Sequence, residues 1–382
     1  MSSLRRRPRS SAAKTPLEDD DLLSEILLRL PPQPSSLPRA SLVCKRWRSL
    51  ASDPGFFRRF RRHHRRSPPL LGFYNERGRF SFIRTLEDPN RVPLGCFSLQ
   101  HGDGGSFLSL GCRHGLVLIF NTTSNQMLVW DPVIGDQHWL TIPPGIASHA
   151  EKTEIHGAVL LPAGEVDHFQ VVVVVAVADN DDKQRRRALA CVYSSQTGLW
   201  DLISTPLPSG IHGIRYLIDM PGRPTKVYTG KPAVLAGNTL YWMLTGNFTG
   251  VLEFDLEKQS LAVIEVPAHL LQMGQLQTVR AEGGALGLLL LTGSILQLWK
   301  RKTDCDGVDS WALERTIDLD KLLSLNSPSK TILGFAEENN VMFLWVCGVI
   351  FMVHLELLEF KKLFDTYIPC HHPFESVYPA GI

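Results

Sequence analysis

Three short clusters hold residue types that metal, phosphate or nucleotide sites use. They are Asp304-Cys305-Asp306-Gly307 with Asp309, Cys370-His371-His372, and Gly102-Asp103-Gly104-Gly105. The Asp304 cluster lacks the acidic spacing and the final Glu of a calcium-binding loop. In the Cys370 cluster adjacent side chains point apart, which does not suit a metal site. The Gly102 cluster is not followed by the helix pattern that a dinucleotide site needs. We therefore predict no catalytic residues, no metal site and no cofactor, and we expect Asp304 to Gly307 to form a hairpin tip after Trp299.

A basic stretch from Arg58 to Arg66 raises the question of nucleic-acid binding. It contains His63-His64 and follows Phe56, Phe57 and Phe60, and phosphate contacts need clustered cations while base stacking needs aromatic rings. The simpler interpretation is that the Phe side chains pack a helix while the Arg side chains face water, so we do not expect nucleic acid as a partner. We likewise expect the charged run Asp179 to Arg187 to be a solvated turn between two strands, with partner binding as the less favoured alternative.

The composition favours an intracellular chain of more than one module. It has 382 residues, 44% of them hydrophobic, and seven cysteines without a C-x-x-C pair, which is typical of free thiols in a reducing compartment. Residues 1–66 hold 16 Lys and Arg against 6 Asp and Glu, whereas the remainder is acidic. Residues 1–15 resemble a disordered basic tail and lack a secretory core, and no apolar stretch reaches the ~20 residues of a membrane span. We expect the cytoplasm, the nucleus or both, and no membrane association.

The elements that follow the tail are short helices. Asp20 or Asp21 can cap a helix that Pro31-Pro32 ends, and Ser35 or Ser36 can cap a second helix. Asp53-Pro54 precedes a third helix, which would carry the three Phe residues. The apolar positions of the first two helices are Leu22, Leu23, Ile26, Leu27 and Leu30, then Leu37, Ala40, Val43, Cys44 and Trp47. Three short helices bury a small core, so an exposed apolar face would invite a partner.

Beyond Pro68-Pro69 the helical period gives way to short β-rich runs separated by Gly, Asn and Asp turns. Three pairs of runs share a pattern, in which an aromatic strand and a polar turn precede an apolar strand that leads to Pro. They are Leu128 to Pro143, Val192 to Pro208 and Phe254 to Pro267. Radially repeated sheets explain this degenerate repeat best. The sequence therefore predicts a propeller-like domain, either with six blades or with fewer blades and long insertions.

The residues of the first module resemble the F-box of plant proteins. The resemblance rests on Leu17, Leu22-Leu23-Ser24-Glu25-Ile26-Leu27, Arg29-Leu30-Pro31, Leu37, and Val43-Cys44-Lys45-Arg46-Trp47-Arg48-Ser49-Leu50, with Glu18 where the family usually has Pro. The second module is similar to the propeller-type, kelch-like F-box-associated domains. That resemblance rests on Val129-Trp130-Asp131-Pro132, Tyr193 to Trp200, Leu240-Tyr241-Trp242 and Phe254-Asp255-Leu256.

This resemblance implies an α+β multidomain adaptor without catalytic activity. We expect a disordered tail (residues 1–15), a three-helix F-box module (16–66) and an all-β propeller-like domain (67–382). The F-box would bind a Skp-type linker protein, and through it a cullin, while the propeller would hold an unknown protein substrate for ubiquitination. Two alternatives stay open, namely a propeller that binds small ligands or carbohydrates and an F-box scaffold outside a ligase. The implied linker-binding residues are Leu17, Leu22, Leu23, Ile26, Leu27, Leu30, Pro31, Leu37, Val43, Cys44 and Trp47.

Overall fold

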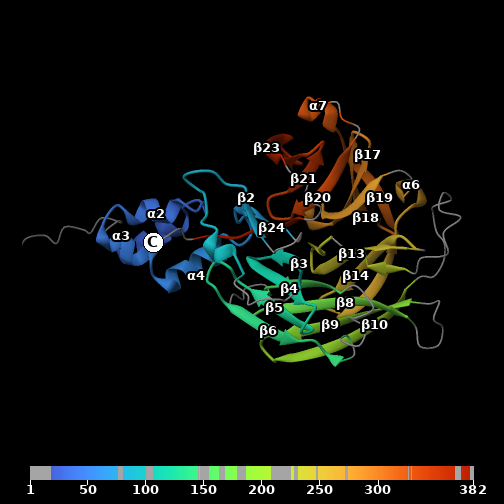
Figure 1. Ribbon diagram of the computed structural model, residues 1–382, viewed down its shortest axis with the longest axis horizontal. Helices are drawn as coiled ribbons and strands as arrows, with labels where there is room; N and C mark the ends of the chain where they lie inside the picture. The colour runs from blue at the N-terminus through green and yellow to red at the C-terminus, as the bar shows by residue number, and fades with distance from the viewer. Residues whose placement is uncertain are drawn as a thin grey trace, which may run out of the picture.

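A small helical module joins a ring of β-sheets (Figure 1). The computed structural model describes residues 19–75, 81–99, 106–144, 146, 155–162, 168–178, 186–207, 225–227, 231–246, 248–271, 274–325, 327, 329–365 and 371–378. The helices of the module are α1 (Asp20–Leu28), α2 (Ser36–Ser41), α3 (Lys45–Ala51) and α4 (Pro54–His63). The predicted basic tail, Leu17, the Gly102 to Gly105 cluster and Cys370 lie outside the described residues.

The prediction of three helices is wrong at the second one, which is broken into α2 and α3. The backbone of Cys44 is extended (φ −162°, ψ 170°), and this turns the chain between the two helices. The turn lets Leu37 and Ala40 of α2 face the core from one direction while Trp47 and Leu50 of α3 pack against it from another. One straight helix could not bring both sets to the same small core.

The capping residues follow the sequence only in part. Asp53 caps α4 as predicted, since its carboxylate accepts a hydrogen bond from the Phe56 N–H at 2.7 Å. Asp19, rather than Asp20 or Asp21, caps α1. The Ser35 hydroxyl makes no capping bond; instead it donates to Asn90 Oδ1 at 2.7 Å, in the chain that follows the propeller's second strand. This contact is a first link between the two modules.

Six antiparallel sheets form the ring. The first contains β1 (Leu70–Asn75), β2 (Ser81–Arg84) and β24 (His371–Glu375). The second contains β3 (Phe107–Arg113), β4 (Leu116–Asn121), β5 (Gln126–Trp130) and β6 (Gln137–Thr141), and the third contains β7 (His156–Leu160), β8 (Gln170–Ala178), β9 (Arg186–Ser194) and β10 (Leu199–Leu207).

The other three sheets complete the ring. The fourth contains β11 (Lys226–Val227), β12 (Val234–Ala236), β13 (Thr239–Thr245), β14 (Gly250–Asp255) and β15 (Ser260–Glu265), and the fifth contains β16 (Gln275–Arg280), β17 (Leu286–Thr292), β18 (Ile295–Thr303) and β19 (Asp309–Asp318). The sixth contains β20 (Lys330–Ala336), β21 (Val341–Val346), β22 (Val349–His354) and β23 (Glu359–Asp365). Short helices α6 (Ala268–Leu271) and α7 (Leu319–Leu323) and the 3-10 turns η2 (Gly95–Phe97) and η3 (Glu282–Gly284) lie in connections.

The first sheet closes the ring with strands from both ends of the described chain. Strand β24 pairs with β1, with Tyr74 opposite His372 and Leu70 opposite Glu375. Strand β24 also contacts β20 on one side and β3 on the other, so it is the innermost strand of its sheet. In the fourth sheet β11 and β12 both pair with β13, and together they form one interrupted inner strand. The architecture is therefore a six-bladed propeller, which settles the blade number that the sequence left open.

The core of the propeller is divided among the interfaces between neighbouring blades. In the described residues, an apolar cluster fills each of the six interfaces, and a seventh lies in the helical module. Strand β8 shows the cause, because Val171, Val173 and Val175 pack toward the second blade while Val172 and Val174 pack toward the fourth. Side chains alternate along a strand, so a fully apolar strand serves two interfaces.

The repeat predicted from the sequence corresponds to the third and fourth strands of successive blades, namely β5–β6, β9–β10 and β14–β15. The apolar stretch Val341 to Val353 forms the hairpin β21–β22. The six described cysteines are free thiols. In the part of the chain that is described, no helix combines the length and apolar character needed to cross a bilayer.

Candidate docking surface on the F-box-like module

Helix α1 has a buried face and an exposed face, and both are apolar. Leu23 and Leu27 are 0% and 1% exposed, whereas Leu22 and Ile26 are 50% and 37% exposed. Residues four apart lie on the same face of a helix, so each pair forms its own stripe. The five apolar positions predicted for this helix therefore divide between the core of the module and its surface.

The core of the module is complete without a partner protein. Leu23, Leu27 and Leu37 pack with Phe56 and Phe60 of α4, while Leu30 and Trp47 pack at the edge of this cluster. Three of the predicted linker-binding residues, Leu23, Leu27 and Leu37, thus lie within the chain's own core. In this conformation their side chains support the surface from beneath and do not line it.

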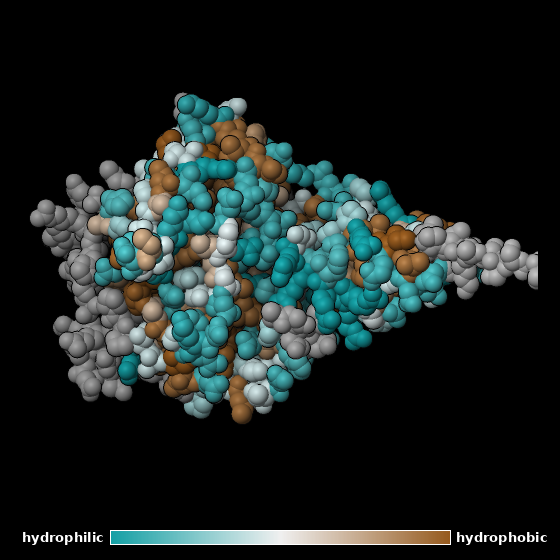
Figure 2. Space-filling model, turned by 180° about the vertical axis from the view of Figure 1, so that it is seen from behind, coloured by the Kyte–Doolittle hydropathy of each residue, from teal (hydrophilic) through white to brown (hydrophobic). Residues whose placement is uncertain are grey.

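The break between α2 and α3 adds a second exposed apolar group. Leu42 and Val43 are 74% and 62% exposed, and Cys44 and Pro31 are also exposed. Arg46 of α3 donates to Asp20 of α1 at 2.7 Å, which joins the break to the start of α1. Figure 2 shows hydrophobic side chains on the module near its end farthest from the propeller. We call Leu22, Ile26, Leu42 and Val43 the apolar docking set.

Ion pairs around this set are exposed and contribute little to stability. Glu25 lies 2.9 Å from Arg59 of α4 and 4.0 Å from Arg29, and all three side chains are at least half exposed. Pairs of this kind are worth about 0 to 1 kcal/mol each. Their main effect is to surround the apolar docking set with charges of both signs.

Helix α4 and the turn that follows it fix the module to the propeller. Arg61 donates to Asp131 at 2.7 Å, and Arg65 donates to the carbonyl oxygens of Leu161 and Pro162. Burial lowers the pKa of the Arg65 guanidinium. The expectation that the Arg side chains of this stretch face water is therefore wrong for Arg61 and Arg65, because the second and third blades supply oxygen acceptors for them. Phe56 and Phe60 pack in the module core as predicted.

The turn between β3 and β4 is shaped to receive α4. Gly115 has φ +77°, and a Cβ there would lie 2.7 Å from Ser376 Oγ and 2.9 Å from an Arg61 nitrogen, so a side chain would push both away. Burial and the neighbouring arginines lower the pKa of His114 to about 2. The His114 ring is therefore neutral, and its Nδ1 accepts a hydrogen bond from the Leu161 N–H at 3.2 Å.

The C-terminal segment also enters the module. Val377, two residues beyond β24, is 3% exposed and packs into the same cluster as Leu27 and Phe60. The sequence gives no signal of this contact, since a single apolar residue after a strand has no periodicity. The core of the helical module is thus built from both ends of the chain.

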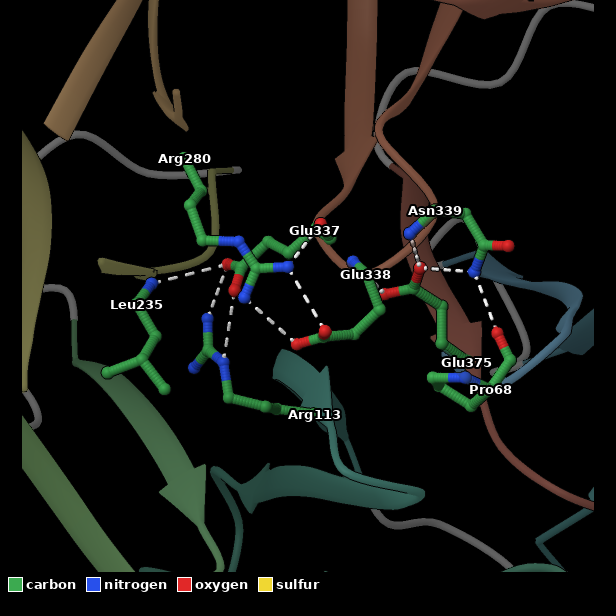
Figure 3. Close-up of polar contacts among 8 residues, drawn as sticks. All are labelled: Pro68, Arg113, Leu235, Arg280, Glu337, Glu338, Asn339 and Glu375. Atoms are coloured by element: carbon green, nitrogen blue, oxygen red, sulfur yellow. Dashed lines mark hydrogen bonds and ion pairs between the residues drawn. The ribbon is translucent and has the colours of Figure 1, made fainter. Parts of the chain in front are cut away.

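A charged network joins several blades beside the β3–β4 turn (Figure 3). Arg113 of β3 pairs with Glu337 at 2.5 Å, and Arg280 of β16 pairs with Glu338 at 3.0 Å. Glu337 also accepts from the Leu235 N–H at 3.4 Å. The network joins four blades through side chains that are 27% exposed or less.

Glu375 of β24 extends this network toward the first blade. Its carboxylate accepts hydrogen bonds from the Asn339 N–H (2.8 Å), the Asn339 side-chain amide (2.7 Å) and the Glu338 N–H (3.2 Å). The same Asn339 amide donates to the Pro68 carbonyl at 2.9 Å. Burial raises the pKa of Glu375 to about 7, although the hydrogen bonds to its carboxylate act in the opposite direction.

The cavity beside this network is about 30 Å³, which is room for one or two water molecules and not for an organic substrate. The carboxylates of Glu337 and Glu338 are bound by arginines. The arrangement holds neighbouring blades together.

The other reactive clusters have structural roles where they are described. Asp304 to Gly307 lies at the tip of the β18–β19 hairpin as predicted, and Asp304 accepts from the N–H groups of Asp306 and Val308. His371 and His372 are neighbours on β24, and His372 is buried. In the described residues no three His, Cys, Asp or Glu side chains gather in a way that could hold a metal ion. Asp179 to Arg185 lies outside the described residues.

Two family models match this chain. The model described as F-box protein AT5G49610-like, beta-propeller matches residues 109–381, and a model described as F-box-like matches residues 20–63. The second match spans α1 to α4, which carry the apolar docking set.

Curated relatives agree with these matches. The F-box/kelch-repeat protein At1g15680 of Arabidopsis thaliana is 25% identical over 323 residues, which cover 78% of this chain and 72% of the relative. The F-box protein At1g49990 of the same plant is 22% identical over 57% of this chain and 58% of the relative.

Among solved structures, a chain in the complex of KlAtg21 with the coiled coil of AgAtg16 has a TM-score of 0.40 and 14% identity, covering 78% of this chain and 85% of that one. With its N-terminal F-box helices and six-bladed ring, the chain belongs to the F-box protein AT5G49610-like, beta-propeller family.

Proposed function

We propose that the protein is a substrate-recruiting adaptor of a Skp/cullin/F-box ubiquitin ligase. The F-box and the propeller support this role at the level of the family, whose members are generally adaptors without catalytic activity. The observation that carries the proposal is the apolar docking set. Leu22, Ile26, Leu42 and Val43 stay exposed although the core of the module is already filled. Apolar side chains that no intramolecular contact explains are typical of a surface that binds another protein.

The proposed contacts with the Skp-type linker differ in kind. Leu22, Ile26 and Val43, with the newly identified Leu42, would contact the linker directly, and Pro31 and Cys44 flank them. Leu23, Leu27 and Leu37 would hold these residues in place, and Leu30 and Trp47 lie at the boundary. A charged substitution in the first group should weaken binding without unfolding the module, whereas one in the second group should unfold it.

The substrate is proposed to bind the opposite end of the propeller. Helix α4 contacts the β3–β4 and β5–β6 turns, through Gly115 and Asp131. In an antiparallel sheet the β4–β5 turn lies at the other end, about 20 Å away for a six-residue strand. The charged network around Arg113 and Glu337 lies at the near end, beside the β3–β4 turn. A target protein at the far end would be held at a fixed distance from the linker, which raises its local concentration near the ubiquitin-carrying enzyme.

A binding experiment with purified Skp-type linker tests the docking proposal. Ile26→Asp and Val43→Asp should each weaken binding by at least tenfold, because a buried unpaired carboxylate costs more than ~1.4 kcal/mol. Leu202→Asp is the matched control, since Leu202 of β10 is 62% exposed and lies on the propeller. Unchanged binding by both F-box variants, with thermal melts equal to that of the wild type, would refute the proposed surface.

Recovery of a cullin together with the linker distinguishes a ligase adaptor from a scaffold. If the intact chain captures the linker and cullin from cells and the Val43→Asp variant captures neither, the ligase role is supported. Capture of the linker without cullin would favour an F-box scaffold that acts outside a ligase.

A further inference from the structure

A cavity of about 310 Å³ lies where α4 of the helical module meets the second and third blades. It is separate from the apolar docking set, which lies on α1 and at the α2–α3 break, and the proposed adaptor role does not use it. Its volume is at the lower end of the range for small-molecule sites, roughly 300 to 1,000 Å³. On the face drawn in Figure 2, the surface between the helical module and the propeller is mainly hydrophilic.

Three arginines line the cavity, Arg58, Arg61 and Arg65. Arg58 and Arg61 are three residues apart on α4 and so share a face of the helix, and Arg65 lies in the turn that follows it. Arg61 and Arg65 are held by Asp131 and by backbone carbonyls. Arg58 is exposed and, within the described residues, forms no ion pair. Arg58 is therefore the cation that can accept a new anionic partner.

The cavity also has an apolar lining. Leu116, Val129 and Phe169 line the cavity, and each is at most 9% exposed. The mouth carries Ile134, Asp136 and His138, all of them exposed. Three carboxylates line the cavity: Asp136 at the mouth, Asp131, which Arg61 binds, and Glu375, which accepts hydrogen bonds from Asn339. They disfavour a ligand that carries more than one negative charge.

From this lining we propose that the cavity binds a small aromatic monocarboxylate, with its ring against the apolar side chains and its carboxylate on Arg58. Guanidinium groups stack on flat rings and pair with planar carboxylates, and the apolar lining removes the carbon skeleton of the ligand from water. Because the site is made from both modules, the ligand binds only when α4 is docked on the propeller. The bound ligand would thereby stabilise one orientation of the F-box relative to the substrate-binding end.

Calorimetric titration of the intact chain tests this site. The probes are benzoate, 1-naphthoate and biphenyl-4-carboxylate, each beside its neutral amide. At least one carboxylate should bind with one-to-one stoichiometry and with a Kd below about 1 mM, and its amide should bind at least about tenfold more weakly. Absence of saturable binding for all three carboxylates would overturn the proposal.

Two variants locate the site. Arg58→Gln should weaken the carboxylate by about tenfold through loss of one charged partner, and Ile134→Glu should do so by placing a negative charge at the mouth. Neither should change binding of the amide. Arg62→Gln is the matched control on the same helix, because Arg62 is exposed and does not line the cavity. If both variants bind the carboxylate as the wild type does, the ligand lies elsewhere and the assignment is wrong. The Skp-type linker takes no part in this assay, so its outcome is independent of the adaptor role.

Discussion

Val377→Ala tests whether the C-terminal segment completes the F-box module. Val377 is 3% exposed and packs among Leu27, Phe60 and their neighbours. Removing two buried methyl groups costs about 1.5 kcal/mol in transfer free energy, and the cavity that remains raises this to about 2 to 3 kcal/mol. A domain of the module's size has roughly 2 to 7 kcal/mol of stability, so the loss is a large share of it.

Amide hydrogen exchange measures this loss locally. Exchange in α1 to α4 should accelerate by roughly 30- to 150-fold, since each 1.4 kcal/mol is a factor of ten. Amides of β16 to β19, on a distant part of the ring, should keep their rates. Val308→Ala is the matched control, because Val308 is 59% exposed at a hairpin tip. Equal exchange rates of α1 to α4 in Val377→Ala and the wild type would refute the reasoning.

Three further predictions concern buried groups. Leu27→Ala should destabilise the module by about 2 to 5 kcal/mol in urea unfolding, because Leu27 is a core residue; a change below 1 kcal/mol would contradict its placement. Arg113→Ala should cost about 3 to 5 kcal/mol by leaving Glu337 buried without its partner, read as a lower Tm, whereas the double variant with Glu337→Gln should recover part of the loss. Glu375 has a raised pKa of about 7 in the folded state, so the stability it contributes is complete below about pH 4.5 and is lost as the pH rises through 7. We compare the free energy of unfolding of the wild type with that of Glu375→Gln. The difference should fall by up to about 3 kcal/mol between pH 5 and pH 8. A difference that does not change with pH would show that Glu375 ionises normally.

Local patterns in the sequence predict the elements well. Strand β5 spans Gln126–Trp130, as its apolar, β-rich composition and flanking turns indicate, and the Asp53-Pro54 pair marks the start of α4. These elements depend on neighbouring residues, so a short window of sequence contains what is needed to predict them.

Contacts between distant segments could not be predicted in the same way. Arg113 and Glu337 are far apart in the chain and meet only because the ring closes. The helical spacing of apolar residues in α1 does not predict whether Leu22 or Leu23 is buried. The two adjacent leucines differ in environment only because α4 covers one of them. The break at Cys44 likewise follows from the need of α2 and α3 to share one small core.

The position of Val377 in the F-box core has a consequence for synthesis of the protein on the ribosome. Helices α1 to α4 are translated early, but Val377 is added only about 300 residues after the end of α4. At roughly 5 to 20 residues per second, this delay is about 15 to 60 seconds. During that time the nascent helices lack a core side chain and the strand that closes the ring. A chain that terminates early would carry α1 to α4 in an incompletely packed form.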